Sequence, residues 1–316
     1  MATRIWIDTD LGTDVDDALA LAFALRHPEL DLVGVSTVFG DVELRARMVE
    51  ALLRLGGVEG LPVLVGMGKP LTKGRIGIML GHEGRGLLEE ASPQMKTESD
   101  PDAARRGDAL AQAIESARAD ALVAIGPLTN VAVLLRAGVQ LPRLSIMGGK
   151  TAPVEAEGVT PTIDEWNWHC DPDAAATLLE QEPPSVGLPR VFPAEITFRT
   201  PISSADHAAL AGGDSLCQAL ASMGEIWLEK LKEIGNPRPQ ILLHDPLTVA
   251  SLPAPDLCPM EPIRLEPGED AGHVRRPGPA NIEVATDVDP QRIRDLVMET
   301  LLGGCPTPCR AASASQ

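Results

Sequence analysis

Five aspartates crowd the first stretch of this chain, where a short apolar run gives way to an amphipathic segment. Asp8, Asp10, Asp14, Asp16 and Asp17 lie within ten residues. Like charges at this density raise one another's pKa values unless a cation neutralises them. Helix capping and the helix dipole account for Asp16 and Asp17, but they leave Asp8 and Asp10 unexplained. Because carboxylate oxygens are the preferred ligands of hard cations, the sequence predicts a calcium or magnesium site here.

The triplet Asp8-Thr9-Asp10 by itself also fits a second chemistry. A strand that ends in Asp-x-Asp resembles the haloacid-dehalogenase-type phosphatases, in which one aspartate is the nucleophile and the other an acid or base. A metal-dependent phosphatase is therefore a competing hypothesis, and the other motifs have to discriminate between the two.

Short apolar runs alternate with amphipathic segments along most of the chain. We predict strands at residues 4–8, 31–38, 62–66, 121–125, 143–147 and 185–191, and helices at 16–26, 43–55, 108–117, from 129, 174–180, 215–234 and 290–302. This alternation predicts parallel β-α-β crossovers. The expected fold class is α/β: a mostly parallel central sheet with helices on both faces and a Rossmann-like core. No linker or repeat divides the chain, so we expect one domain over 1–305 and a disordered tail at 306–316.

In such a sheet, ligands collect at the carboxyl ends of the strands. Polar or glycine-rich segments follow several predicted strands there: Phe39-Gly40-Asp41, Gly126-Pro127-Leu128-Thr129-Asn130 and Gly148-Gly149. His244-Asp245-Pro246 comes later in the chain. We expect these segments to meet the aspartates at one active site.

The charge and the ends of the chain limit the possible partners. A formal net charge of −18 and a pI near 4.7 disfavour nucleic acid as a partner. No apolar run approaches the roughly 20 residues that span a bilayer, so no membrane partner is expected. The N-terminus lacks the pattern of a signal peptide, and five scattered cysteines indicate free thiols. We therefore expect a cytoplasmic protein.

Six motifs, in order, resemble the inosine–uridine-type nucleoside hydrolases, a calcium-dependent family. Residues 8–20 resemble its N-terminal signature, 37–41 its second loop, 126–130 its third motif and 147–149 its fourth. Residues 165–167 with 171–172 look like its ribose-binding segment, and 244–247 like its last motif. Each match alone is weak, but six in the right order are specific. A phosphatase explains only the first.

The resemblance implies a nucleoside hydrolase fold and a hydrolase of nucleoside salvage. The enzyme would split the N-glycosidic bond of ribonucleosides into ribose and free base, using a calcium-bound water activated by an aspartate. Departure of the base leaves an oxocarbenium-like ribosyl cation, which carboxylates around the sugar would stabilise. The implied partners are a small-molecule nucleoside and further copies of the chain, in a homodimer or homotetramer. The alternative is a non-catalytic relative that binds nucleoside or ribose.

Roles are carried over by position. Ca²⁺ would be held by Asp10, Asp17, Asp245 and the backbone carbonyl of Ile125. Asp10 would also take the proton from water, and His244 would protonate the leaving base, with His82 as a second candidate. The expected substrate-binding residues are Asp16, Asp41, His82, Met147, Glu165, Trp166 and Asn167.

This chain departs from the family pattern near both Asp14 and Asp41. Two residues are inserted between Asp10 and the Asp16-Asp17 pair. Aligned from the right, on Asp-Asp-Ala-Leu-Ala, Asp14 becomes an extra acid; aligned from the left, it takes a ligand role. Asp41 stands where asparagine is usual, which bears on ribose contacts and turnover.

Overall fold

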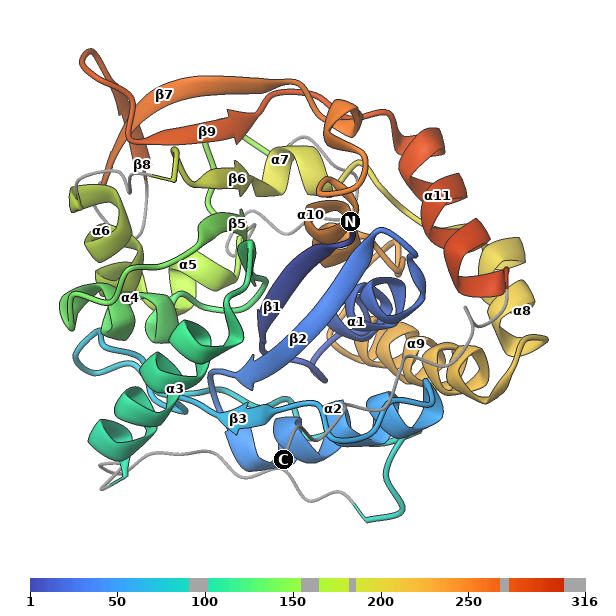
Figure 1. Ribbon diagram of the computed structural model, residues 1–316. Coiled ribbons are helices and arrows are strands. Elements are labelled where there is room, and N and C mark those ends of the chain that lie inside the picture. The colour runs from blue at the N-terminus through green and yellow to red at the C-terminus, as the bar shows by residue number, and fades with distance from the viewer. Residues whose placement is uncertain (91–101, 155–164, 182–185, 268–272, 304–316) are drawn as a thin grey trace.

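Nine strands form one sheet in the computed structural model, which describes residues 1–90, 102–154, 165–181, 186–267 and 273–303 (Figure 1). The predicted tail at 306–316 lies outside the described residues. The strand order is β3-β2-β1-β4-β5-β6-β9-β7-β8. The strands are β1 Thr3–Thr9, β2 Leu30–Thr37, β3 Val63–Val65, β4 Ala121–Ala124, β5 Arg143–Met147, β6 Arg190–Phe192, β7 Met260–Pro267, β8 His273–Arg276 and β9 Ile282–Ala285.

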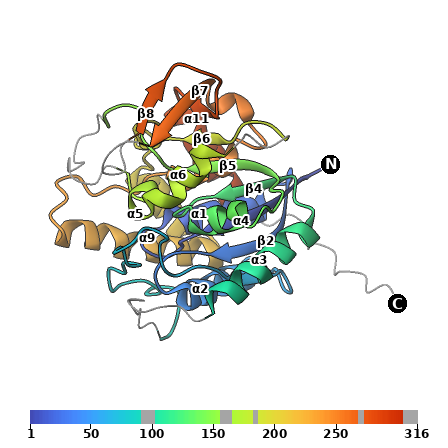
Figure 2. The ribbon, with the colours of Figure 1, turned by 90° about the vertical axis from the view of Figure 1, so that its left-hand side faces the viewer.

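The prediction of a mostly parallel sheet is confirmed. All neighbours from β3 to β9 pair in parallel, whereas β7 runs antiparallel to both β9 and β8. The β7–β8 hairpin lies at the end of the sheet away from β3 (Figure 2). These last three strands were not predicted. In β7, Pro262 and Pro267 stand among charged residues, a composition that argues against a strand with a neighbour on each side.

Helices connect most of the strands. They are α1 Asp16–Arg26, α2 Val42–Leu55, α3 Ala103–Ala117, α4 Thr129–Arg136, α5 Asn167–Cys170, α6 Pro172–Glu180, α7 Ala194–Thr197, α8 Ser204–Ala211, α9 Ser215–Glu233, α10 His244–Ala250 and α11 Pro290–Leu302. The predictions for α1 and α11 are confirmed to the residue at both ends. No described helix has the length and apolarity that crossing a membrane requires.

Both faces of the sheet are covered, because alternate side chains of each strand enter different cores. In β1, Ile5 and Ile7 pack into a core that includes residues of α1, α2, α9, α10 and α11. Trp6, between them, points to the other face and joins residues of α3, α4 and α6. The apolar run that predicted a buried strand therefore supplies both cores.

The chain changes direction across the sheet at β1. From β1 it proceeds outward to β2 and β3, and it then returns to pair β4 with the other edge of β1. Connections leave β1 and β4 toward opposite sides, so a crevice opens between their carboxyl ends. Asp10 follows β1 at this point and Ile125 follows β4. A side chain at Gly126 would lie only 2.9 Å from the Asp10 backbone nitrogen, so the close approach of the two loops requires glycine.

Candidate active site

The loop from β1 to α1 is tied back on itself by side-chain hydrogen bonds. The Thr9 hydroxyl donates to the Asp17 carboxylate and accepts from the Leu11 backbone N–H at 3.1 Å. Thr9 is 1% exposed and Asp17 is 2% exposed, so water does not compete for these bonds. The strand end thereby holds the first turn of α1 in place.

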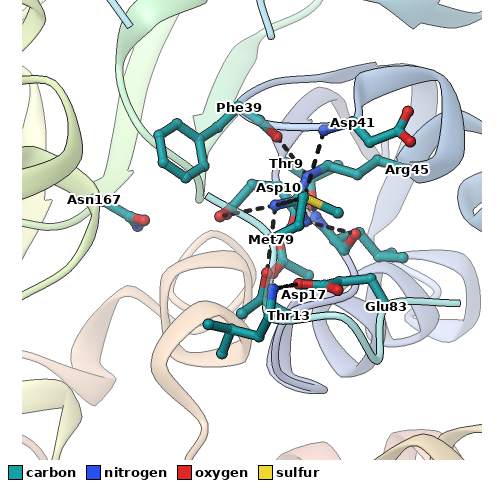
Figure 3. A network of polar contacts seen from close by, with 12 residues as sticks. Thr9, Asp10, Thr13, Asp17, Phe39, Asp41, Arg45, Met79, Glu83 and Asn167 are labelled. Atoms are coloured by element: carbon teal, nitrogen blue, oxygen red, sulfur yellow. Dashed lines mark hydrogen bonds and ion pairs between the residues drawn. The ribbon is translucent and has the colours of Figure 1, made fainter. Parts of the chain in front are cut away.

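Arg45, a fully buried residue of α2, anchors the same loop (Figure 3). Its guanidinium donates to the carbonyls of Asp10 and Leu11, the latter at 2.9 Å, and to the Phe39 carbonyl at 2.6 Å. One guanidinium nitrogen lies 4.0 Å from the Asp10 carboxylate. Arg45 therefore joins the loops after β1 and β2 and brings a positive charge to Asp10. It went unnoticed in the sequence, although it lies three and four residues before Met48 and Val49 on the apolar face of α2.

The carboxylates of the loop gather into a cluster with Asp245. Asp14, Asp16 and Asp17 each offer an oxygen atom, and the three atoms lie within 4.8 Å of one another. Burial and the neighbouring carboxylates raise the pKa values of Asp16, Asp17 and Asp245 well above their ordinary range. Burial also raises the pKa of Asp10 to about 6, against the opposing effect of Arg45. Such a group of carboxylates could hold a metal ion.

These carboxylates line a cavity of about 410 Å³. Ten of the residues singled out in the sequence lie along its wall: Asp10, Asp16, Asp17, Ile125, Met147, Glu165, Trp166, Asn167, His244 and Asp245. They come from the carboxyl ends of β1, β4 and β5, from the first turn of α1, and from the starts of α5 and α10. The parallel sheet thus brings together side chains that are more than two hundred residues apart.

Asn167, at the start of α5, bridges two strand ends. Its side-chain nitrogen donates to the carbonyls of Ile125 at 3.0 Å and Met147 at 3.2 Å. Glu165, just before it, accepts from the backbone N–H groups of Trp168 and His169 and so caps this short helix. Burial raises the pKa of Glu165 to about 7, opposed by these hydrogen bonds. Trp166 contacts Phe39 edge-on, with ring centroids 6.4 Å apart.

His244 faces the cavity from the first residue of α10. Its Nδ1 lies 2.7 Å from the Thr197 hydroxyl, and its ring contacts Phe198 edge-on with centroids 4.8 Å apart. Among the described residues, its Nε2 atom has no hydrogen-bond partner. Burial lowers the pKa of His244 to about 4, so its imidazole is neutral at pH 7 in this pocket.

Asp41 and His82 do not line this cavity. The Asp41 carboxylate accepts from the Leu44 backbone N–H at 3.1 Å, as the N-cap of α2, and points away from Asn167 (Figure 3). His82 Nε2 lies 2.6 Å from the Thr13 carbonyl, and its ring stacks on Trp227 with centroids 5.9 Å apart. Asp41 therefore stabilises the start of α2, and His82 contacts two residues, Thr13 and Trp227, that themselves line the cavity.

Asp8, which the phosphatase hypothesis needs as a nucleophile, also lies off the cavity. It is 1% exposed, and one carboxylate oxygen accepts from the Ser36 hydroxyl and from the Asn130 amide, the latter at 2.7 Å. Burial raises its pKa to about 7. A carboxylate buried behind the strands cannot attack a ligand in the cavity.

The cavity also has an apolar and aromatic part that the sequence did not predict. Phe198, Trp227, Leu231 and Ile241 line it, with Asn236, Arg238 and Gln240 from the segment after α9. Trp227 and Leu231 are four residues apart on α9, a spacing that also describes an ordinary core-facing stripe. Only their convergence with Phe198 distinguishes a pocket wall from a core.

The raised carboxyl pKa values predict how the stability of the metal-free protein depends on pH. Asp8 and Glu165 titrate near pH 7 in the folded chain, against ordinary values of 3.8 and 4.5. Between about pH 4 and pH 7 the folded state therefore binds more protons than the unfolded state. The free energy of unfolding should fall as pH rises through this range. Urea denaturation in the presence of a chelator, at pH 5 and at pH 8, measures this; equal stability at both would contradict it.

Comparison with known proteins gives a consistent result over most of the chain. The family model described as inosine-uridine preferring nucleoside hydrolase matches residues 5–295. A pyrimidine-specific ribonucleoside hydrolase, RihA of Salmonella enteritidis, is 32% identical over 271 residues, which cover 81% of each chain. A solved plant nucleoside hydrolase superposes with a TM-score of 0.76 at 26% identity, covering 96% of this chain and all of the other. A purine-preferring ribonucleoside hydrolase from Gardnerella vaginalis has the same fold, with a TM-score of 0.77 at 24% identity over 95% and 98% of the two chains.

Proposed function

This chain belongs to the inosine–uridine preferring nucleoside hydrolase family and is a ribonucleoside hydrolase, and we propose that calcium and Asp10 carry its reaction. The observation that best supports this proposal is the composition of the cavity. One part is lined by carboxylates and the other by Phe198 and Trp227. A nucleoside has the same two halves, a polar diol-bearing sugar and a flat aromatic base. A cavity of about 410 Å³ has room for both.

The carboxylates fit a calcium ion. Asp245 is 3% exposed and lacks a hydrogen-bond donor among the described residues, so its charge requires a cation. We assign Asp10, Asp17, Asp245 and the Ile125 carbonyl to the ion, since all four line the cavity and offer oxygen ligands. Bound there, calcium would act as a Lewis acid that holds the ribose diol and acidifies a water.

The chain's own groups account for the rest of the chemistry. Asp10 accepts the proton from the attacking water as the new bond forms at the anomeric carbon. Asp16 accepts a hydrogen bond from the ribose diol, and Asn167 and Glu165 bind the 3′- and 5′-hydroxyl side of the sugar. The negative charges around the ring stabilise the ribosyl cation as the glycosidic bond breaks.

We assign the leaving-group contact to His244. Its Nδ1 lies against the Thr197 hydroxyl, which leaves Nε2 to face the cavity. If the hydroxyl donates to Nδ1, the neutral ring keeps its proton on Nε2 and donates it as a hydrogen bond to the departing base, which supports the leaving group without transferring the proton that was first expected of His244. His82 is separated from the cavity in this structure, so we give it a supporting role in holding Thr13.

The two alternatives receive less support. A phosphatase would need Asp8 exposed to its substrate, and Asp8 is locked between Ser36 and Asn130. A binder without turnover was suggested by Asp41 in place of asparagine. Because Asp41 caps α2 outside the cavity, that substitution leaves the sugar contacts of the other residues intact.

A reducing-sugar assay tests the proposal directly. We expect ribose release from at least one of uridine, cytidine, inosine and adenosine with calcium present. Release should stop when a chelator removes the ion and resume when calcium is restored. Absence of ribose from all four substrates would contradict hydrolysis, whereas activity that persists in chelator would contradict only the calcium assignment. The rates would also rank the bases, which matters because relatives with both preferences match this chain.

The organisation of the protein completes the proposal. One sheet connects the elements from β1 to β9, which supports a single domain over residues 1–305. We also propose that the protein acts in the cytoplasm, as a homodimer or homotetramer. Sedimentation analysis of the purified chain would measure its oligomeric state.

A further inference from the structure

Asp14 lies between Asp10 and the Asp16-Asp17 pair, where this chain departs from the family pattern. It directly precedes Val15, the N-cap of α1, and lines the cavity beside Asp16 and Asp17. An oxygen of each of the three carboxylates lies within 4.8 Å of an oxygen of the others. This spacing places an Asp14 oxygen near Asp17, so that the two carboxylates can share one cation, while Asp16 beside them remains for the ribose diol.

Asp14 caps no described helix, and its side chain shares a hydrogen bond with Asp16, another carboxyl group. The N-cap of α1 is Val15, and no side chain makes a capping hydrogen bond there. Among the described residues, no Lys, Arg or backbone N–H contacts the Asp14 carboxylate. In the metal-free protein Asp14 and Asp16 disfavour each other's charge and share a hydrogen bond in its place.

Asp245 provides an independent indication that a cation belongs among these groups. It comes from α10, more than two hundred residues away in the chain, and it is 3% exposed. No described residue donates a hydrogen bond to its carboxylate, although it faces the same cavity. A buried carboxylate without a donor is stable as an anion only beside a positive charge.

We propose that Asp14 is a direct ligand of the calcium ion in this chain, so that the inserted loop adds a carboxylate to the set formed by Asp10, Asp17, Asp245 and the Ile125 carbonyl. Calcium accepts roughly six to eight oxygen atoms, so the Asp14 oxygen takes a place that water otherwise fills. This inference rests on the proposed calcium dependence. It predicts tighter calcium binding at the expense of stronger repulsion in the metal-free state.

Terbium luminescence provides the sharpest test, because lifetimes in H₂O and D₂O count the water molecules on the bound ion. Asp14→Ala should raise that count by about one, since water replaces the lost oxygen. Calcium titration by calorimetry should show affinity reduced by about tenfold or more in Asp14→Ala and Asp14→Asn. The same titrations at low and high potassium chloride distinguish direct ligation by Asp14 from attraction of the ion by the Asp14 charge at a distance. A field effect is screened by salt, whereas the loss of a ligand persists.

Asp31→Asn is the matched control. Asp31 lies near the start of β2, at the amino ends of the strands, whereas the cavity lies at their carboxyl ends. Its carboxylate pairs with Arg4 at 3.1 Å. Its removal changes the net charge equally and should leave both the water count and the calcium affinity unchanged. An unchanged water count in Asp14→Ala, or an affinity loss that disappears at high salt, would overturn the proposal.

Thermal unfolding in chelator shows whether Asp14 serves the fold instead. Removal of a repelled carboxylate should raise the melting temperature of the metal-free protein and reduce the additional stabilisation by calcium. A lower melting temperature in the metal-free state would contradict the proposal. None of these measurements uses substrate, so a failure here differs from a failure of hydrolysis. If wild type binds calcium and the Asp14 variants bind it equally well, only this inference is refuted, and the proposed calcium dependence stands.

Discussion

Replacing Asp10 by asparagine is expected to lower kcat for ribose release by about a thousandfold. Asp10 is 6% exposed and lines the cavity at the carboxyl end of β1. Burial raises the pKa of Asp10 to about 6, while Arg45 opposes that rise, so the group is ionised at neutral pH yet still basic. Asparagine retains an oxygen that can contact calcium but cannot accept a proton.

This difference makes the experiment specific for the proton transfer. The assay is run at saturating calcium, and calcium affinity is measured separately on the same variant. We expect a modest change in affinity together with the large loss of kcat. Asp31→Asn, far from the cavity, controls for the altered charge. If Asp10→Asn keeps kcat within tenfold of wild type once calcium is saturating, Asp10 is not the base.

Replacing Arg45 by methionine is expected to destabilise the protein by about 3–5 kcal/mol, the range typical of removing one partner from a buried charged pair. The guanidinium is fully buried and satisfies the carbonyls of Asp10, Leu11 and Phe39. Methionine fills a similar volume but leaves these three acceptors without their donor. It also removes the positive charge that lies 4.0 Å from the Asp10 carboxylate.

Arg47→Met is the matched control, because Arg47 is exposed and lies on the same helix two residues later. It should change the free energy of unfolding little. Arg45→Lys keeps the charge without the forked donors and should lie between wild type and Arg45→Met. Urea denaturation, with and without calcium, measures all three variants. Equal stabilities of Arg45→Met and Arg47→Met would show that the loop does not depend on the buried guanidinium.

The sequence by itself determined the parts of this protein that depend on local patterns. The apolar run before Asp8 predicted β1, and the spacing of apolar residues predicted α1 and α11 to the residue. Such patterns suffice because the positions of apolar residues along a short segment show which side of a strand or helix is buried. The order of strands and helices then implied a parallel sheet, whose carboxyl edge gathers the residues that follow each strand. That rule explains why Asp10, after β1, and Ile125, after β4, line one cavity. Asn167, at the start of α5, was expected there only from the family resemblance.

Only the tertiary structure decided which polar residues face that cavity. Asp8 and Asp10 are two residues apart and alike in type, yet Ser36 and Asn130 from distant segments enclose one of them and leave the other at the cavity wall. Asp41 lies in one of the family motifs and His82 in the segment after β3. Hydrogen bonds to the Leu44 backbone N–H and the Thr13 carbonyl hold both of them outside the cavity.

The aromatic wall was equally hidden in the sequence. Trp227 shares its helical stripe with core residues, and Phe198 comes from a segment without periodicity. Whether such a side chain packs against another apolar group or borders an open space depends on what the rest of the chain places opposite it. Here Phe198 after α7, Trp227 of α9 and His244 of α10 meet at the cavity. Local motifs therefore identified the polar residues of the site. The shape of the cavity depends on contacts between segments far apart in the chain.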